Sequence, residues 1–210
     1  MKKTFVLVVL FILPIVAYLF FASGVNNFGK LPTLTEGIKE LNAEGQDVRF
    51  TDNITILGFL GYDIALKKGN AFNLNQKIYK RFYEFKDFQC VMIVPKGTED
   101  KVAELKKELA DLADVRKWRF VFADPQMVRQ IFGNLGTNLM LDKNLGTPYV
   151  FIIDKERNLR GRTADEEEGT KYGFNTNSVA ELNNKMEDDV KVILAEYRLA
   201  LKKNNANRAK

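Results

Sequence analysis

The stretch Leu145–Arg162, LGTPYVFIIDKERNLRGR, predicts two antiparallel strands joined by a tight turn. Residues 149–154 are a run of aromatic and β-branched residues, residues 155–158 are polar, and residues 159–162 can return beside the first strand. Pro148 directly precedes the first strand. Because proline cannot donate a hydrogen bond to a sheet, and because its peptide bond becomes cis more readily than others, it marks a special backbone position at this edge.

Upstream of this hairpin, short apolar runs alternate with segments of helical spacing. The expected strands are residues 53–61, 88–95 and 118–124, and the expected helices are residues 74–85, 98–112 and 125–133. Residues 62–73 contain Gly69 and are expected to form a loop. The alternation predicts an α/β fold, a central mixed sheet flanked by helices, in which the first three strands are mostly parallel.

Two further segments complete the predicted domain. After a polar loop, residues 178–203 repeat apolar positions every three or four residues, and Ser178 and Glu181 have the spacing of a capping box, so a long closing helix is expected. At the other end, polar and apolar residues alternate before residue 50, which predicts an outer hairpin through residues 48–53.

The N-terminal segment predicts a membrane anchor. Residues 4–22 carry no charge and would span about 30 Å as a helix, and Lys2 and Lys3 precede them. The positive-inside rule then places the following domain outside the cytoplasmic (inner) membrane, in the periplasm or its equivalent. Cleavage of a signal peptide at Gly24 stays open. The predicted organisation is 1–24 transmembrane anchor or uncleaved signal, 25–49 linker and outer hairpin, 50–203 domain, and 204–210 basic tail.

The composition is that of a globular protein without a nucleic-acid-binding face. Of the 210 residues 46% are hydrophobic and 28% are charged. The formal net charge is +5, but Lys2, Lys3 and residues 202–210 hold six basic residues and no acidic one. The rest of the chain is therefore close to neutral, and no nucleic-acid partner is predicted.

Few residues in the sequence could carry chemistry. There is no histidine, and the single cysteine, Cys90, lies in an apolar run where a free thiol behaves as a small hydrophobic residue. The acidic run 165–168 lacks the ligand spacing of a calcium loop, so a solvated turn is expected. The spacing of Met92, Met127 and Met140 gives no convergence. No catalytic, cofactor-binding or metal-binding residue is predicted.

The order of elements, together with FADPQMVRQIFGN at 122–134 and GTPYVFIIDKERNLRGR at 146–162, resembles the thioredoxin superfamily. With the N-terminal apolar run, it is similar to the membrane-anchored Sco/SenC-like group over about residues 50–200. The resemblance implies an extracytoplasmic thioredoxin-like domain associated with copper delivery to cytochrome oxidase.

The ligands of that group do not carry over. The group binds copper through a CxxxC motif after the first core strand and a histidine before the hairpin. The matching segments here, LGYDIALKKGNAFNLN at 60–75 and LMLDKN at 139–144, contain neither residue. Copper(I) selects thiolate ligands, so a degenerate, redox-inactive member is predicted.

The predicted function is an interaction or assembly module for an envelope or respiratory complex. Thr147 and Pro148, facing Gly61, Tyr62 and Asp63, would form an edge that binds an extended peptide of a protein partner by β-augmentation. In the simpler interpretation Pro148 only shapes the hairpin. The alternative functions are a Sco-like copper chaperone or thiol oxidoreductase acting with a partner or through Cys90, and an acyl- or lipid-binding envelope protein.

Overall fold

The computed structural model describes residues 9–16, 18, 29–41 and 48–208. The strands are β1 (Thr33–Thr35), β2 (Ile54–Leu60), β3 (Phe88–Pro95), β4 (Trp118–Ala123), β5 (Gly146–Ile153), β6 (Leu159–Arg160), β7 (Arg162–Asp165), β8 (Gly169–Lys171) and β9 (Phe174–Asn175). The helical segments are α2 (Ile64–Leu74), the π-helical turn η1 (Asn75–Tyr79), α3 (Lys80–Phe82), α4 (Glu99–Ala110), α5 (Pro125–Gly133), α6 (Val179–Glu181), the π-helical turn η2 (Leu182–Met186) and α7 (Glu187–Arg208).

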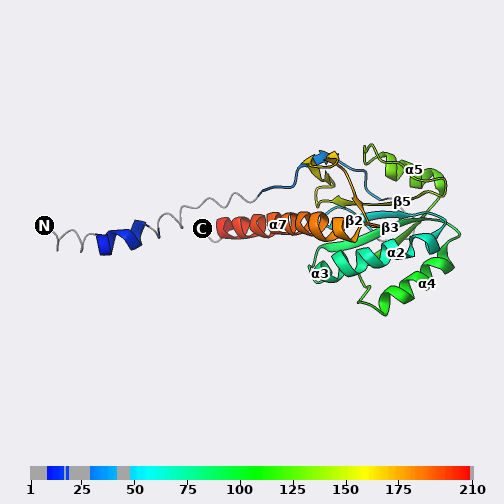
Figure 1. Cartoon of the computed structure of the whole chain (residues 1–210), viewed down its shortest axis with the longest axis horizontal. Coiled ribbons are helices and arrows are strands. Elements are labelled where there is room, and N and C mark those ends of the chain that lie inside the picture. The colour runs from blue at the N-terminus through cyan, green and yellow to red at the C-terminus, as the bar shows by residue number, and fades with distance from the viewer. Residues whose placement is uncertain (1–8, 17, 19–28, 42–47, 209–210) are drawn as a thin grey trace.

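The arrangement of the strands confirms the predicted α/β fold with a central mixed sheet. The strand order is β1-β6-β5-β2-β3-β4, and β9 also pairs with β5. Strands β2, β3 and β4 are parallel, as predicted, because a helical crossover connects each to the next. Strand β5 lies antiparallel to β2 and forms the predicted hairpin with β6. Figure 1 shows α2, α3 and α4 on one side of this sheet and α5 on the other.

Strands β2 and β3 are buried along their whole length. On one face, α2, α4 and α7 pack against alternate residues such as Ile56 and Cys90. On the other face, α5 and residues 38–41 pack against Leu57 and Val91. Helices on both faces explain why these strands are continuous apolar runs rather than alternating ones. The ends of β2 and β5 are thus fixed in a sheet that is packed on both faces.

Residues 62–73 form most of helix α2, so the loop predicted there is wrong. Ile64, Ala71 and Leu74 face the core, with exposed fractions of 3% or less. Gly69 lies on the outer face, with no heavy atom within 4 Å of where a Cβ would stand. A glycine costs a helix only about 1 kcal/mol, which the packing of the inner face outweighs.

Three other expectations need correction. Residues 48–53 form a loop rather than an outer hairpin, and the strand in that region is β1, which pairs with β6. The segment expected to be a polar loop before Ser178 contains β7, β8 and β9. Phe85 and Leu112 lie just beyond the ends of their helices and are each 44% exposed, so they do not continue the buried faces.

The closing helix begins as predicted. The hydroxyl oxygen of Ser178 accepts a hydrogen bond from the backbone N–H of Glu181, at 3.1 Å. The side chain of Glu181 instead accepts from the backbone N–H of Asn175, at 2.8 Å, so only half of the capping box forms. Helix α7 continues to Arg208, beyond the predicted end at residue 203 and into the predicted tail, and Figure 1 shows it projecting past the sheet.

The chain enters the domain at Leu31, whose backbone N–H and carbonyl groups are both hydrogen-bonded. Its N–H donates to the carboxylate of Glu196 on α7, at 2.8 Å, and its carbonyl accepts from Nε of Arg160 on β6, also at 2.8 Å. Arg160 also pairs with Asp154, at 3.0 Å, and with Glu196, at 2.8 Å. This arrangement, called the Leu31 clamp below, joins the entering chain, the hairpin and the closing helix.

Most of the predicted membrane anchor lies outside the described residues. Residues 9–16 are helical, and their large apolar side chains are at least 40% exposed. Within the parts of the chain that the structure describes, no helix has the length and apolar character needed to cross a bilayer.

Candidate functional site

The structure brings together the two segments that the sequence predicted to face each other. The backbone N–H of Tyr62 donates to the carbonyl of Asn144, at 2.9 Å, and the carboxylate of Asp63 accepts from the side-chain amide of Asn144. Gly61 has a φ of +69°, and a Cβ on it would lie 2.6 Å from the backbone nitrogen of Gly146. Glycine is therefore needed here both for its left-handed conformation and for the close approach of the two backbones.

Thr147 and Pro148 follow this contact in β5. Thr147 is 5% exposed and Pro148 is half-buried. No peptide bond is cis among the described residues, so the bond between Thr147 and Pro148 is trans. The register between β2 and β5 shifts here, since Gly58 pairs with Val150 and Leu60 with Gly146. Pro148 thus lies in a bulge, where a residue without an N–H donor is tolerated.

The carbonyl of Pro148 is already bound within the domain. It accepts from the backbone N–H of Thr176, at 2.9 Å, and from its hydroxyl, at 2.6 Å. The hydroxyl of Thr176 in turn accepts from the side-chain amide of Asn70 on α2, at 2.7 Å. An incoming strand would therefore have to engage the backbone on the Thr147 side of the proline. That this edge binds a peptide stays a prediction.

Charged residues that the sequence analysis missed hold the two segments of the site together. Asp142 accepts from Nζ of Lys67 on α2 and from the backbone N–H groups of Asn144 and Gly146, each at 2.9 Å. Burial alone would raise the pKa of Asp142, but the hydrogen bonds from Gly146 and Lys67 outweigh burial, so this pKa is lowered. The only local signal was the DKN triplet at 142–144, typical of a turn.

A second lysine, Lys101 on α4, donates to the carbonyl of Tyr62, at 3.3 Å. Beside it, a hollow of about 270 Å³ opens between α2 and α4, lined by aliphatic side chains such as Ile64 and by the ion pair between Lys68 and Glu108. Side chains on both sides of the junction between β2 and α2 thus form bonds that hold it in place, and their roles are structural.

Cys90 does not take part in this site. It lies at the centre of β3, opposite Ile56 on β2 and Trp118 on β4, and its side chain is fully buried. Burial raises the pKa of its thiol well above the ordinary value. Because the thiolate is the nucleophile and the metal ligand, Cys90 in this structure is a packing residue.

The methionines do not form a ligand set around Cys90. The side chain of Met92 fills the space next to Gly58, Met127 is half-buried on α5, and Met140 is 81% exposed in the loop before β5. Across the described ranges, no group of three or more His, Cys, Asp or Glu residues could hold a metal ion.

The acidic run 165–168 includes the predicted exposed turn, at Glu166, Glu167 and Glu168, and lysines pair with three of its four carboxylates. Lys185 pairs with Asp165, at 2.9 Å, and with Glu167, at 2.8 Å. Lys171, whose side chain is completely buried, pairs with Glu168 and with Glu181, at 2.8 Å from the latter. These pairs attach the β7–β8 hairpin to the closing helix.

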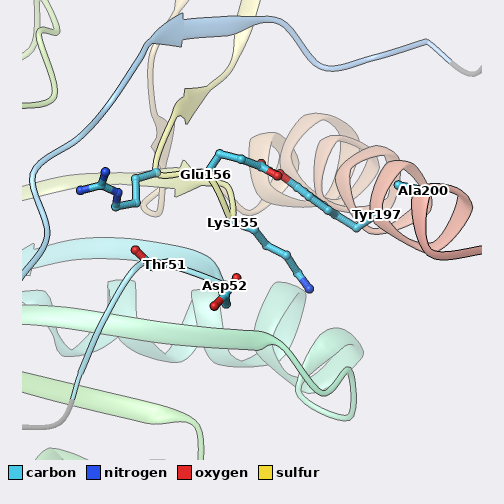
Figure 2. Close-up of a pocket in the computed structure, with 7 residues that line it drawn as sticks. Thr51, Asp52, Lys155, Glu156, Tyr197 and Ala200 are labelled. Carbon is cyan, nitrogen blue, oxygen red and sulfur yellow. The ribbon is translucent and has the colours of Figure 1, made fainter. Parts of the chain in front are cut away.

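Further hollows near charged groups lie at the other end of β2. One, of about 580 Å³, is lined by Lys155, Glu156 and Tyr197 among others, and Figure 2 shows the Glu156 and Tyr197 side chains meeting across it. The hydroxyl of Tyr197 donates to the carboxylate of Glu156. No sequence pattern predicted this hollow, because its walls come from three distant segments.

Comparison with known proteins identifies the fold. No protein-family model matches the sequence, and no curated protein does. Among solved structures, a "putative protein disulfide isomerase" from Bacteroides thetaiotaomicron has a TM-score of 0.52 and 12% identity, covering 79% of this chain and 94% of its own. A "putative electron transport protein" from Aquifex aeolicus has a TM-score of 0.51 and 18% identity, covering 78% and 98%.

A copper-bound ScoI from Arabidopsis thaliana also matches, with a TM-score of 0.48, 17% identity, and coverage of 75% of this chain and 99% of that one. At these identities the comparisons concern the fold alone. The first two structures agree with the strand order in assigning a thioredoxin-like α/β fold, in which a central mixed sheet is flanked by helices.

Proposed function

We propose that this chain is a membrane-anchored, extracytoplasmic thioredoxin-like protein that binds a protein partner and carries out no thiol or copper chemistry. The partner would bind at the β2–α2 edge, which we define by Gly61, Tyr62, Asp63, Thr147 and Pro148. The edge holds Tyr62 and Asp63 instead of cysteines, and both are bound to Asn144. This observation carries the proposal, because a fixed hydrogen-bonded surface lies where the reactive groups would be needed. The partner would belong to an envelope or respiratory complex.

Exposed apolar side chains support a docking role for this edge. Tyr62 is 38% exposed and Leu66, on the first turns of α2, is 79% exposed. Met140, two residues before Asp142, is 81% exposed. Large exposed apolar residues gathered beside a fixed backbone edge are typical of protein interaction surfaces.

The membrane anchor is supported by the N-terminal sequence and by the helix over residues 9–16. The uncharged run of residues 4–22 is long enough to span a bilayer. The described helix carries exposed apolar side chains such as Leu10, Phe11 and Leu13, which water does not favour. Lys2 and Lys3 before the run favour an extracytoplasmic domain.

Photo-crosslinking in cells would test the docking edge. A photoreactive amino acid at position 66 is expected to crosslink one membrane-complex protein, and the same residue at position 112, also exposed but beyond α4, is not. Met140→Glu should weaken the crosslink from position 66, since it places a charge in the apolar surface. Equal crosslinking from both positions would contradict the proposal, as would a crosslink that Thr147→Asp and Met140→Glu leave unchanged in folded protein.

A copper titration addresses the alternative of a Sco-like chaperone or thiol oxidoreductase acting with a partner or through Cys90. Stoichiometric copper(I) binding that disappears in Cys90→Ser would favour that alternative. We expect no such binding by the folded protein, because the thiol is enclosed by the sheet and the helices.

A further inference from the structure

The end of the domain where α7 leaves the sheet is hollowed on several sides. The hollow of Figure 2 and two others, of about 280 and 420 Å³, all include Tyr197 in their walls. The exposed residues around them come from the entering chain, the turn before β3 and α7. We call this surface the α7 end and define it by Lys30, Phe85, Lys86, Arg198 and Leu199.

The acidic residues in these walls are largely engaged by neighbours. Asp87 pairs with Lys155, at 2.5 Å, and Asp154 and Glu196 pair with Arg160. Glu156 accepts the hydroxyl of Tyr197. Among the acidic wall residues that the structure describes, only Asp52 has a carboxylate without a hydrogen bond or ion pair, while its backbone N–H donates to the carbonyl of Lys155, at 3.0 Å.

The basic residues of the α7 end are exposed and unengaged. Lys30, Lys86 and Arg198 are exposed and make no ion pair with the described side chains. Residues 198–210 add basic charge, with five basic residues and no acidic one. Phe85, 44% exposed, and Leu199, 36% exposed, lie among them. This mixture of basic and apolar side chains fits an anionic surface with an apolar interior beneath it.

The Leu31 clamp fixes where this surface lies relative to the apolar run. Eight residues separate Ala22, at the end of the run, from Leu31. Their reach is at most about 30 Å, even fully extended. Glu196, which binds Leu31, is two residues from Arg198 on the same helix. The α7 end is therefore the part of the domain held nearest to the predicted anchor.

We propose that the α7 end docks on an anionic lipid surface, with the basic side chains at the headgroups and Phe85 and Leu199 at the interface. The inference rests on the proposed membrane anchor. Each basic residue close to an anionic membrane strengthens binding by about fivefold, so the three exposed ones act together. Docking there would turn the β2–α2 edge, at the opposite end of β2, away from the bilayer.

The full-length chain in lipid nanodiscs allows a direct test. An environment-sensitive fluorophore is placed on Leu199→Cys, or on Leu66→Cys as the matched control at the other end of the domain. Cys90 is buried and should stay unlabelled. A labelling reaction on the wild-type chain serves as the control for this. Quenching by brominated lipid is then compared in phosphatidylcholine and in a phosphatidylcholine–phosphatidylglycerol mixture. We expect quenching at position 199 in the anionic mixture, lost at high salt and in Lys86→Glu/Arg198→Glu, and none at position 66.

Three outcomes would overturn the inference. If the chain enters the discs but position 199 is quenched no more than position 66 in the anionic mixture, the α7 end does not dock, although the anchor stands. If quenching at position 199 is equal in both lipids and insensitive to salt and charge reversal, anionic lipid is not what it recognises. If the chain fails to float with the discs after alkaline extraction, the proposed anchor fails, and the inference fails with it.

Discussion

Replacing Gly61 by alanine probes the contact between the β2–α2 junction and the start of β5. At a φ of +69° an alanine costs about 1–2 kcal/mol of stability, because its Cβ approaches its own carbonyl oxygen. The new Cβ would also lie 2.6 Å from the backbone nitrogen of Gly146 and closer still to the carbonyl oxygen of Asn144. Backbone atoms cannot rotate away, so forced displacement of β5 should add about 1–3 kcal/mol.

Gly169→Ala is the matched control for this substitution. Gly169 has a nearly equal φ, +67°, but no heavy atom lies within 4 Å of the position its Cβ would take. We therefore expect it to cost only the conformational part, about 1–2 kcal/mol. The difference between the two variants isolates the close approach, because both carry the same change in the flexibility of the unfolded chain.

Urea unfolding followed by fluorescence measures both variants. Trp118 is the only tryptophan in the chain and is 2% exposed, so its emission reports global unfolding. Gly61→Ala should lower the midpoint by clearly more than Gly169→Ala, with an unchanged m-value. Equal midpoint shifts would show that the two segments do not meet as described, and the geometry of the candidate site would have to be abandoned.

Three further predictions concern buried groups. Arg160→Met should destabilise the domain by about 3–5 kcal/mol, because it leaves the carboxylate of Asp154 buried and without its ion pair. Lys96→Met, at an exposed ion pair, should cost less than about 1 kcal/mol. The urea midpoints of the two variants test this difference. Cys90 should react with a thiol reagent no faster than the domain unfolds, and rapid modification of native protein would contradict its burial. Burial raises the pKa of Tyr79 from 10.0 to about 12. The neutral phenol therefore contributes its full stability below pH 10, and this contribution is lost as the pH rises toward 12. Tyr79→Phe should remove this loss from the pH dependence of the urea midpoint.

The sequence predicted the sheet better than the parts that cover it. Strand β3 was found from one continuous apolar run, since burial on both faces leaves no polar residue in it. Helix α2 was missed because Gly69 and several polar residues interrupt its outer face, and only the tertiary packing of Ile64, Ala71 and Leu74 reveals the inner one. The hairpin of β7 and β8 was missed for a related reason, because ion pairs to the closing helix stabilise it.

The candidate site was only partly accessible from the sequence. The pairing of Gly61, Tyr62 and Asp63 with the segment before Thr147 followed from the expected fold, and the structure brings these segments together. The bonds that hold them, from Lys67 to Asp142 and from Asn144 to Asp63, join residues about 80 positions apart in the chain. No local pattern encodes such contacts, so geometry alone could supply them.

The Leu31 clamp also determines how the domain would respond to mechanical load. A pull on the chain upstream of residue 31 first meets the bonds to Glu196 and Arg160, before it reaches the pairing of β1 with β6. Tension is thereby shared between the closing helix and the hairpin instead of peeling β1 from the sheet edge one hydrogen bond at a time. A domain tethered at this point could bear strain from a bound partner without losing its outermost strand.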